Sequence, residues 1–362
     1  MTIDTYTSRL AATRTLLPQW QVDALLITSA SNRRWLSGFT GSAGSLLITA
    51  TSAFLATDFR YWVQATAQAP TFSLYRQQPP ERELAHLLAE SGAAIIGIEA
   101  NHLTVGGLTE LARKAEGLNW VHLPVTVERL REQKDAAELT LIRRAAAITD
   151  QVMAQVPALA RPGMSERQLA WELEKRMREA GATALAFEVI VASGPHAALP
   201  HHRPGERLLQ PGDALVVDMG AEIDGYKSDL TRSFYLGHDP SADYQAIYQL
   251  VHQAQSAVLD GIRPGMTSQA IDALARDPIA AAGHREHFGH GLGHSLGLDI
   301  HEGPRLAHSL AHSIIPAGVI LTVEPGIYLP DWGGVRIEDL ILLTEDGPEL
   351  LSHCPKAPAI PL

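Results

Sequence analysis

The segment ALVVDMGAEIDGYKSDLTR, residues 214–232, places two aspartates within a strand–turn–strand pattern. Asp218 closes the apolar run ALVVD, and Asp229 follows a turn that Asp224-Gly225 indicates, because Asp-Gly is a strong hairpin signal. A hairpin brings the two carboxylates together. An unpaired ionised group inside an apolar strand is costly to bury, so the pattern predicts that something else compensates the charge.

A second acidic pair has the same arrangement nearer the C-terminus. Glu324 follows the run VILTV, and Glu338 ends GGVRIE, with turn-forming residues PDWGG at 330–334 between them. A single acidic pair on a hairpin is more often solvated surface. The order of both pairs and of the histidines between them is what favours a functional site.

The segment between the hairpins, FGHGLGHSLGLDIHE (residues 288–302), holds His290, His294 and His301 among glycines that allow close approach to a ligand. Four carboxylates and one imidazole make an oxygen-rich site suited to two divalent ions, such as manganese, cobalt, iron or zinc. Two dications neutralise the four carboxylates and bridge a water, which becomes the nucleophile. Standing alone, the histidine segment would be read more readily as an ordinary loop.

Composition narrows the functional classes. The 362 residues are 46% hydrophobic and 19% charged, which predicts a large core and two domains. The net charge of -11 gives no basic patch for nucleic acid or anionic lipid, so a small or peptidic substrate is favoured. One cysteine, Cys354, and an N-terminus without a long apolar run predict a cytoplasmic protein. The longest apolar run, near IIPAGVILTV, is too short for a membrane span.

The chain is expected to hold two domains, at residues 1–130 and 131–362. In the first, short β-rich runs such as VDALLIT and AIIGIE alternate with helical stretches, which predicts a compact α/β domain. The boundary precedes a long amphipathic helix, for which Asp135 is the expected N-cap, three residues before Glu138.

The second domain contains an internal repeat. RPGMS at 161–165 recurs as RPGMT at 263–267. In each copy Pro-Gly interrupts one helix, and Ser165 or Thr267 can cap the next. The repeat predicts two related α+β halves whose strands face a central cleft.

Several of these segments resemble the motifs of a known family. VVDMGAEIDGYKSDLTR, GHSLGLDIHE, VEPGIY and GGVRIED are similar, in this order, to motifs of the pita-bread metallopeptidases. RRWLSGFTGSAGSLLIT and ATDFRYWVQA resemble the creatinase-type N-terminal domain of Xaa-Pro aminopeptidases and prolidases. The resemblance implies an α/β creatinase-like N-terminal domain and an α+β pita-bread catalytic domain with an internal pseudo-twofold repeat.

The resemblance also assigns the metal site. It implies two divalent ions per subunit, with manganese favoured and cobalt, zinc or iron as alternatives, and with Asp229 and Glu338 touching both ions. The implied ligands are Asp218, Asp229, His294, Glu324 and Glu338.

Further roles follow from the same resemblance. His201, in ASGPHAALPHH, and His301 are assigned to the scissile carbonyl and the oxyanion. Glu324 is expected to carry a proton from the water to the proline nitrogen, and Arg336 to orient a ligand carboxylate. His290 is expected to line the proline pocket.

Other residues have weaker assignments. His202 is the less favoured of the two adjacent histidines, and simple packing is as good an account of it and of His290. Four N-terminal residues could help to limit substrate length, but ordinary surface positions are favoured for them: Asp23, Arg33, Arg34 and Trp35.

The resemblance predicts hydrolysis of the bond between an N-terminal residue and a following proline, whose imide nitrogen lacks the hydrogen that ordinary proteases use. The segment GFTGSAG favours an Xaa-Pro aminopeptidase. A prolidase restricted to dipeptides is the alternative, and a non-catalytic binding homologue is a more distant one. The family also implies a homodimer, in which the partner's N-terminal domain limits the substrate.

Overall fold

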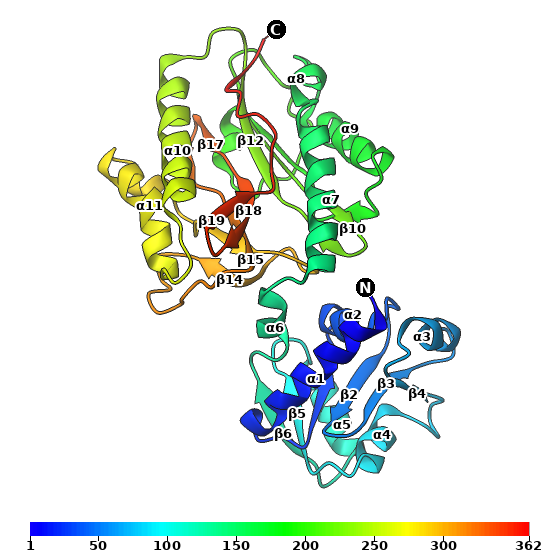
Figure 1. Ribbon diagram of the computed structural model, residues 1–362. Coiled ribbons are helices and arrows are strands. Elements are labelled where there is room, and N and C mark those ends of the chain that lie inside the picture. The colour runs from blue at the N-terminus through cyan, green and yellow to red at the C-terminus, as the bar shows by residue number, and fades with distance from the viewer. Residues whose placement is uncertain (362) are drawn as a thin grey trace. The chain divides into compact units, whose positions relative to one another are not determined.

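In the computed structural model, which describes residues 1–361, the apolar runs of the N-terminal part form a six-stranded mixed sheet (Figure 1). The strand order is β4-β3-β2-β1-β5-β6, with β1 antiparallel to β2 and parallel to β5. The strands are β1 (Ala24–Ile27), β2 (Ser45–Thr49), β3 (Ala53–Thr57), β4 (Ser73–Arg76), β5 (Ile95–Glu99) and β6 (Asn119–Leu123). The helices are α1 (Ile3–Trp20), α2 (Ala30–Ser37), α3 (Trp62–Gln68), α4 (Leu84–Glu90), α5 (Val105–Lys114) and α6 (Glu128–Glu132).

Local sequence explains these elements. The strand β1 is buried at all four positions, which suits a central strand covered on both faces and accounts for its continuous apolar run. The helix α2 begins after Ser29, whose side chain accepts a hydrogen bond from the Asn32 N–H, and ends at Gly38 with φ of 77°. The expected α/β character of the N-terminal domain is confirmed.

The expectation of surface positions is wrong for Arg33 and Trp35, which are 3% and 4% exposed. The Arg33 guanidinium donates to the carbonyl oxygens of Gly44 at 2.6 Å and Gly41 at 2.7 Å. These bonds pair the two terminal nitrogens of the guanidinium and fix the loop before β2, whereas Nε is buried without a hydrogen-bond partner among the described residues. Asp23 is exposed, as expected.

The chain divides into two compact units, Met1–Arg131 and Glu132–Leu362. Within the second unit the helices are α7 (Ala136–Met153), α8 (Val156–Leu159), α9 (Glu166–Glu179), α10 (Ala242–Gly261) and α11 (Ser268–Ala281), with 3-10 turns η1 (Gly194–Ala198) and η2 (Arg285–His287). Its strands are β7 (Ala184–Leu185), β8 (Ile190–Ser193), β9 (Ala214–Met219), β10 (Ala221–Ile223), β11 (Tyr226–Lys227), β12 (Leu230–Leu236), β13 (Gly293–Ser295), β14 (Glu302–Leu306), β15 (Val319–Val323), β16 (Gly326–Leu329), β17 (Gly333–Arg336), β18 (Asp339–Thr344), β19 (Gly347–Leu350) and β20 (Ala359–Ile360).

Both predicted hairpins are present. The strands β9 and β12 pair antiparallel, and the small hairpin β10–β11 continues from them to the Asp224-Gly225 turn. Both turn residues have positive φ, 46° and 81°, which a two-residue turn of this kind requires. Nearer the C-terminus β16 pairs with β17, and β15 pairs with β18. The acidic residues therefore lie at strand ends that face one another.

The two copies of the repeat have the same local structure. Ser165 caps α9, and Thr267 caps α11, each by accepting from a backbone N–H three residues on. The Gly163 N–H donates to the Leu209 carbonyl at 2.9 Å, and the Gly265 N–H donates to the Ile315 carbonyl at the same distance. The predicted caps and the predicted repeat are confirmed.

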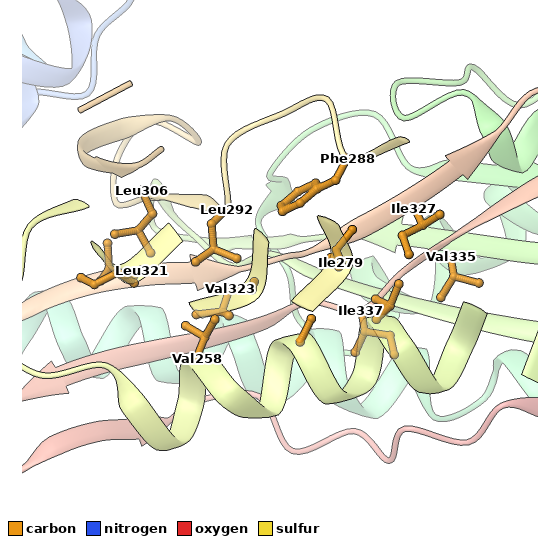
Figure 2. Close-up of a cluster of buried hydrophobic side chains, with 14 of the residues drawn as sticks. Val258, Ile279, Phe288, Leu292, Leu306, Leu321, Val323, Ile327, Val335 and Ile337 are labelled. Atoms are coloured by element: carbon orange, nitrogen blue, oxygen red, sulfur yellow. The ribbon is translucent and has the colours of Figure 1, made fainter. Parts of the chain in front are cut away.

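The core of the second unit lies between helices and strands. Figure 1 shows α10 and α11 on one side of the strands and α7 and α9 on the other. Figure 2 shows part of the buried cluster that α10 and α11 share with the strands, with Val258 and Ile279 from the two helices and Val323, Ile327 and Val335 from β15, β16 and β17. Each fully buried aliphatic side chain contributes about 1.5–3 kcal/mol. This packing holds the strand ends, and with them the acidic residues, in fixed positions.

No helix within residues 1–361 combines the length and the apolar character that a membrane span requires.

Candidate metal centre

Three carboxylates from the two hairpins meet inside the second unit. Asp218 lies in β9, Asp229 directly precedes β12, and Glu338 lies between β17 and β18. One oxygen from each lies within 4.8 Å of the other two, and all three residues are buried. Thr231 of strand β12 connects the two hairpins. It lies opposite Asp218 in the sheet, and the Thr231 carbonyl accepts a hydrogen bond from the Glu338 N–H at 3.1 Å. The arrangement could hold a metal ion.

Glu324 and His294 complete this group, which we call the carboxylate centre. Glu324 follows β15, and His294 lies in β13. The His294 Nε2 atom is 3.5 Å from Glu324 Oε1 and 3.7 Å from Asp229 Oδ2. The five side chains that the family resemblance assigned to the metals are therefore neighbours.

Two glycines permit the close approach of these strands. A Cβ at Gly220 would overlap the carbonyl oxygen of Ser228, and one at Gly293 would overlap that of Thr322. Any larger residue would push apart either the two aspartate segments or β13 and β15. The glycines thus fix the spacing of the centre.

Burial and mutual repulsion raise the pKa values of the carboxylates in this centre. Burial raises the pKa of Asp229 well above its ordinary value, and the charges of Glu338, Asp218 and Glu324 raise it further. Burial, followed by the charges of Glu324 and Asp218, has the same effect on the pKa of Glu338. The pKa of Glu324 rises to about 7, chiefly through burial. Without cations these carboxylates hold protons at a pH where exposed ones are ionised.

Two further observations fit a divalent cation. Asp218 Oδ1 is buried and has no hydrogen-bond partner among the described residues. His294 Nδ1 lies 3.1 Å from the Ser295 carbonyl, which can only accept, so Nδ1 carries the hydrogen and Nε2 turns its lone pair towards the carboxylates. Burial lowers the pKa of His294 to about 4, which keeps the ring neutral. The unpaired oxygen of Asp218 and the lone pair on Nε2 of His294 are the kinds of donor that a metal site requires.

Arg336 links the carboxylate centre to residues that the sequence analysis did not single out. Its Nη2 is 2.7 Å from Asp218 Oδ2, and its Nε donates to Thr231 Oγ1 at 3.0 Å. Thr231 in turn donates to Glu338 Oε2 at 2.7 Å. Thr231 and Tyr328 both lie inside the motifs quoted above. Each is a polar residue in an apolar strand, and this feature could have marked them as site residues from the sequence.

Tyr328 connects Arg336 to His290. The Tyr328 hydroxyl accepts from Arg336 Nη1 at 3.0 Å and lies 2.9 Å from His290 Nε2. Because His290 Nδ1 faces the Gly291 carbonyl at 2.8 Å and carries the hydrogen, Nε2 accepts from the tyrosine. The hydrogen-bonding atoms of His290 are therefore engaged by the protein.

All the residues that the sequence assigned to the site line one cavity of about 540 Å³. His301 lies against His294, with ring centroids 4.4 Å apart. His202 also lines the cavity, but its Nε2 is 2.8 Å from Glu166, a residue that sequence reasoning missed. The predicted residues in the lining are His201, Asp218, Asp229, His290, His294, His301, Glu324, Arg336 and Glu338.

Comparison with protein families gives two matches that together span most of the chain. Residues 140–345 match metallopeptidase family M24. Residues 9–133 match the creatinase/prolidase N-terminal domain.

The similarity to individual proteins extends over nearly the whole chain. An uncharacterized peptidase of Bacillus subtilis, YqhT, is 40% identical over 96% of this chain and 98% of its own. The structure of an Xaa-Pro dipeptidase from Bacillus anthracis has a TM-score of 0.94 at 36% identity, covering 98% of this chain and 99% of that one. The X-Pro aminopeptidase of Thermotoga maritima has a TM-score of 0.87 at 32% identity, covering 96% and 99%.

Proposed function

Because the chain belongs to metallopeptidase family M24 and carries a creatinase/prolidase N-terminal domain, we propose that it hydrolyses the bond between an N-terminal residue and a following proline. The observation that carries the proposal is the buried carboxylate centre, which opens into a cavity lined by every residue assigned to the reaction. The pita-bread fold with a creatinase-like N-terminal domain, expected from the sequence, agrees with these matches.

The proposed metal ligands are Asp218, Asp229, His294, Glu324 and Glu338. Four carboxylates and a neutral imidazole match the charge and the donor preference of two hard divalent ions. We propose manganese as the metal. When bound, such ions would polarise the scissile carbonyl and lower the pKa of water. Arg336 would keep Asp218 oriented through its 2.7 Å contact.

The other polar residues of the cavity would act on the substrate. Burial lowers the pKa of His301, so its ring is neutral and can donate one N–H to the scissile carbonyl or to the oxyanion. We assign the same role to His201, which lines the same cavity. Glu324, with its pKa near 7 in the free protein, is suited to accept a proton and return it to the leaving proline nitrogen.

Proline selectivity would come from the shape of the cavity. His290 uses both ring nitrogens within the protein, so its ring presents carbon atoms to a ligand. Phe187 and Ile190 line the cavity as well. These faces suit a pyrrolidine ring, which has no N–H to offer. We assign His290 to the proline pocket on this basis.

The length of the substrate separates two candidates. We propose an Xaa-Pro aminopeptidase, following the GFTGSAG segment and the structural likeness to an X-Pro aminopeptidase. The likeness to an Xaa-Pro dipeptidase supports a dipeptidase as the second candidate. Arg203 and Arg305 in the cavity lining could pair with the free carboxylate of a dipeptide.

Matched substrates distinguish these candidates. Release of alanine from Ala-Pro-Ala by the metal-loaded enzyme supports the aminopeptidase. Cleavage of Ala-Pro without cleavage of Ala-Pro-Ala overturns that assignment in favour of the dipeptidase.

We further propose a cytoplasmic homodimer. The cytoplasmic assignment is supported by a single buried cysteine, Cys354, which leaves no internal disulfide to form. The dimer is supported by the family to which the chain belongs, and sedimentation analysis tests it.

The raised pKa values predict how metal binding depends on pH. The folded metal-free protein holds protons on Asp229, Glu324 and Glu338 that the unfolded chain releases above about pH 4.5. The free energy of unfolding of the metal-free protein therefore falls as the pH rises from about 4.5 to about 7, the pKa of Glu324, and continues to fall above it for Asp229 and Glu338. Metal binding expels these protons, so the gain in Tm on adding manganese should be larger at pH 8 than at pH 6. His294, with its pKa of about 4, is neutral at both pH values and adds no dependence.

Thermal unfolding with manganese or with a chelator measures that gain. An equal gain at the two pH values would show that the carboxylates do not bind the metal.

A further inference from the structure

A second cluster of metal-ligating side chains lies apart from the carboxylate centre, around Glu166. Glu166 is the first residue of α9 and is fully buried. His196 Nδ1 lies 3.0 and 3.1 Å from its two carboxylate oxygens, and His202 Nε2 lies 2.8 Å from Oε2. We call these residues the Glu-His-His cluster.

The cluster has the geometry of a ligand set. One ligand atom from each of its three residues lies within 4.8 Å of the other two, and the two rings are 4.3 Å apart at 33°. His196 Nδ1 is almost equidistant from both oxygens of Glu166, so it occupies the position in front of the carboxylate where a cation binds. The His196 side chain is 36% exposed and has room to move outward.

Among the described residues Glu166 forms no ion pair with a lysine or arginine, although Arg207 lies close enough to interact with its charge. The ion-pair partners of Glu166 in this part of the chain are His196 and His202, which carry charge only when protonated. The nearby Arg207 is turned to Asp213, at 2.6 and 2.8 Å, and to the Ser193 hydroxyl at 2.7 Å. The Glu166 carboxylate thus lies between two imidazoles, and a divalent ion bound among the three groups would supply the cationic charge that no ion pair with a lysine or arginine supplies.

The carboxylate is also held rigidly in place. Its Oε1 accepts from the Ser193 N–H at 2.9 Å and from the Ser193 hydroxyl at 2.7 Å, and its Oε2 accepts from the Gly205 N–H at 3.2 Å. Such outer hydrogen bonds orient the carboxylate ligands of metal sites.

The internal repeat shows that the fold does not require this cluster. Ser268 follows the cap of α11 as Glu166 follows the cap of α9. The backbone N–H groups of both residues bond to the loop beyond, to Arg207 and Ser313 respectively. Ser268 is also buried, but its side chain is a neutral hydroxyl that hydrogen-bonds to the backbone of Ala307. The second copy of the repeat therefore has no carboxylate at this position, and the Glu-His-His cluster is a feature of the first copy alone.

We propose that Glu166, His196 and His202 form a separate site for a divalent transition metal of the zinc type. Two imidazoles and one carboxylate, with water as a fourth ligand, are a donor set that zinc uses, whereas the carboxylate centre suits harder ions. His202 directly follows His201, and both line the same cavity. Zinc at this site fixes the segment that carries His201 and so makes the state of the cavity depend on zinc. The site itself does not depend on the proposed peptidase function.

Equilibrium dialysis against zinc, followed by elemental analysis, tests the site. The full-length protein, His196→Ala, His202→Ala and the control His308→Ala, an exposed histidine elsewhere, are compared at micromolar free zinc. We expect each of the first two variants to hold one zinc fewer per chain than the unaltered protein, whatever the carboxylate centre holds, and the control to lose none.

Circular dichroism confirms that each variant is folded, and His196, being partly exposed, is the variant least able to disturb the core. Equal zinc counts in His196→Ala, in His202→Ala and in the unaltered protein would overturn the proposal and leave a hydrogen-bonded cluster only.

Discussion

Asp229→Asn lowers the hydrolysis of an Xaa-Pro peptide by about 10⁴-fold, the range seen when an essential catalytic group is lost. The change keeps the shape of the side chain but removes a charged ligand between His294 and the other carboxylates. It also removes a carboxylate whose pKa is raised first by burial and then by the charges of its acidic neighbours. The Tm of the metal-free variant should therefore not fall, while its metal content does. Steady-state rates, metal analysis and thermal unfolding measure the three effects.

Asp224→Asn is the matched control for this variant. It makes the same chemical change in the same hairpin, at an exposed turn residue with φ of 46°, a conformation that asparagine tolerates. Its rate should match that of the unaltered enzyme. Equal rates for Asp229→Asn and the control would remove Asp229 from the metal ligands.

His301→Ala lowers kcat by about 10²–10³-fold, the usual loss for one donor to an oxyanion. The His301 ring packs against His294, but its assigned role is towards the substrate. The metal content should therefore stay unchanged, which separates this variant from a ligand variant. Elemental analysis beside steady-state kinetics provides both readouts. An unchanged kcat, or a loss of metal equal to the loss of rate, would contradict the assignment.

The sequence predicted those parts of the site that depend on local signals. Asp-Gly at 224–225 and the Pro-Gly pairs of the repeat indicate backbone conformation directly, and each lies at the turn or helix boundary expected of it. Once the hairpins were placed, the meeting of their acidic residues followed from antiparallel pairing. The cavity also contains every residue that the family resemblance assigned to the site.

The parts that sequence reasoning missed depend on contacts between distant segments. Glu166 reads locally as an ordinary acidic residue in the first turn of a helix, and its histidine partners come from a loop about thirty residues later. Thr231 and Tyr328 matter because strand packing places their hydroxyls beside Arg336. Arg33 is buried because a loop wraps its guanidinium, which no local pattern indicates.

Hydrolysis of Ala-Pro-Ala and of Ala-Ala-Ala by the metal-stripped enzyme, with and without added manganese, tests the central claim most directly. We predict that alanine is released from the proline peptide alone, and only when metal is restored. Failure to cleave Ala-Pro-Ala and Ala-Pro with manganese, cobalt or zinc restored, or cleavage at an equal rate without metal, would contradict it.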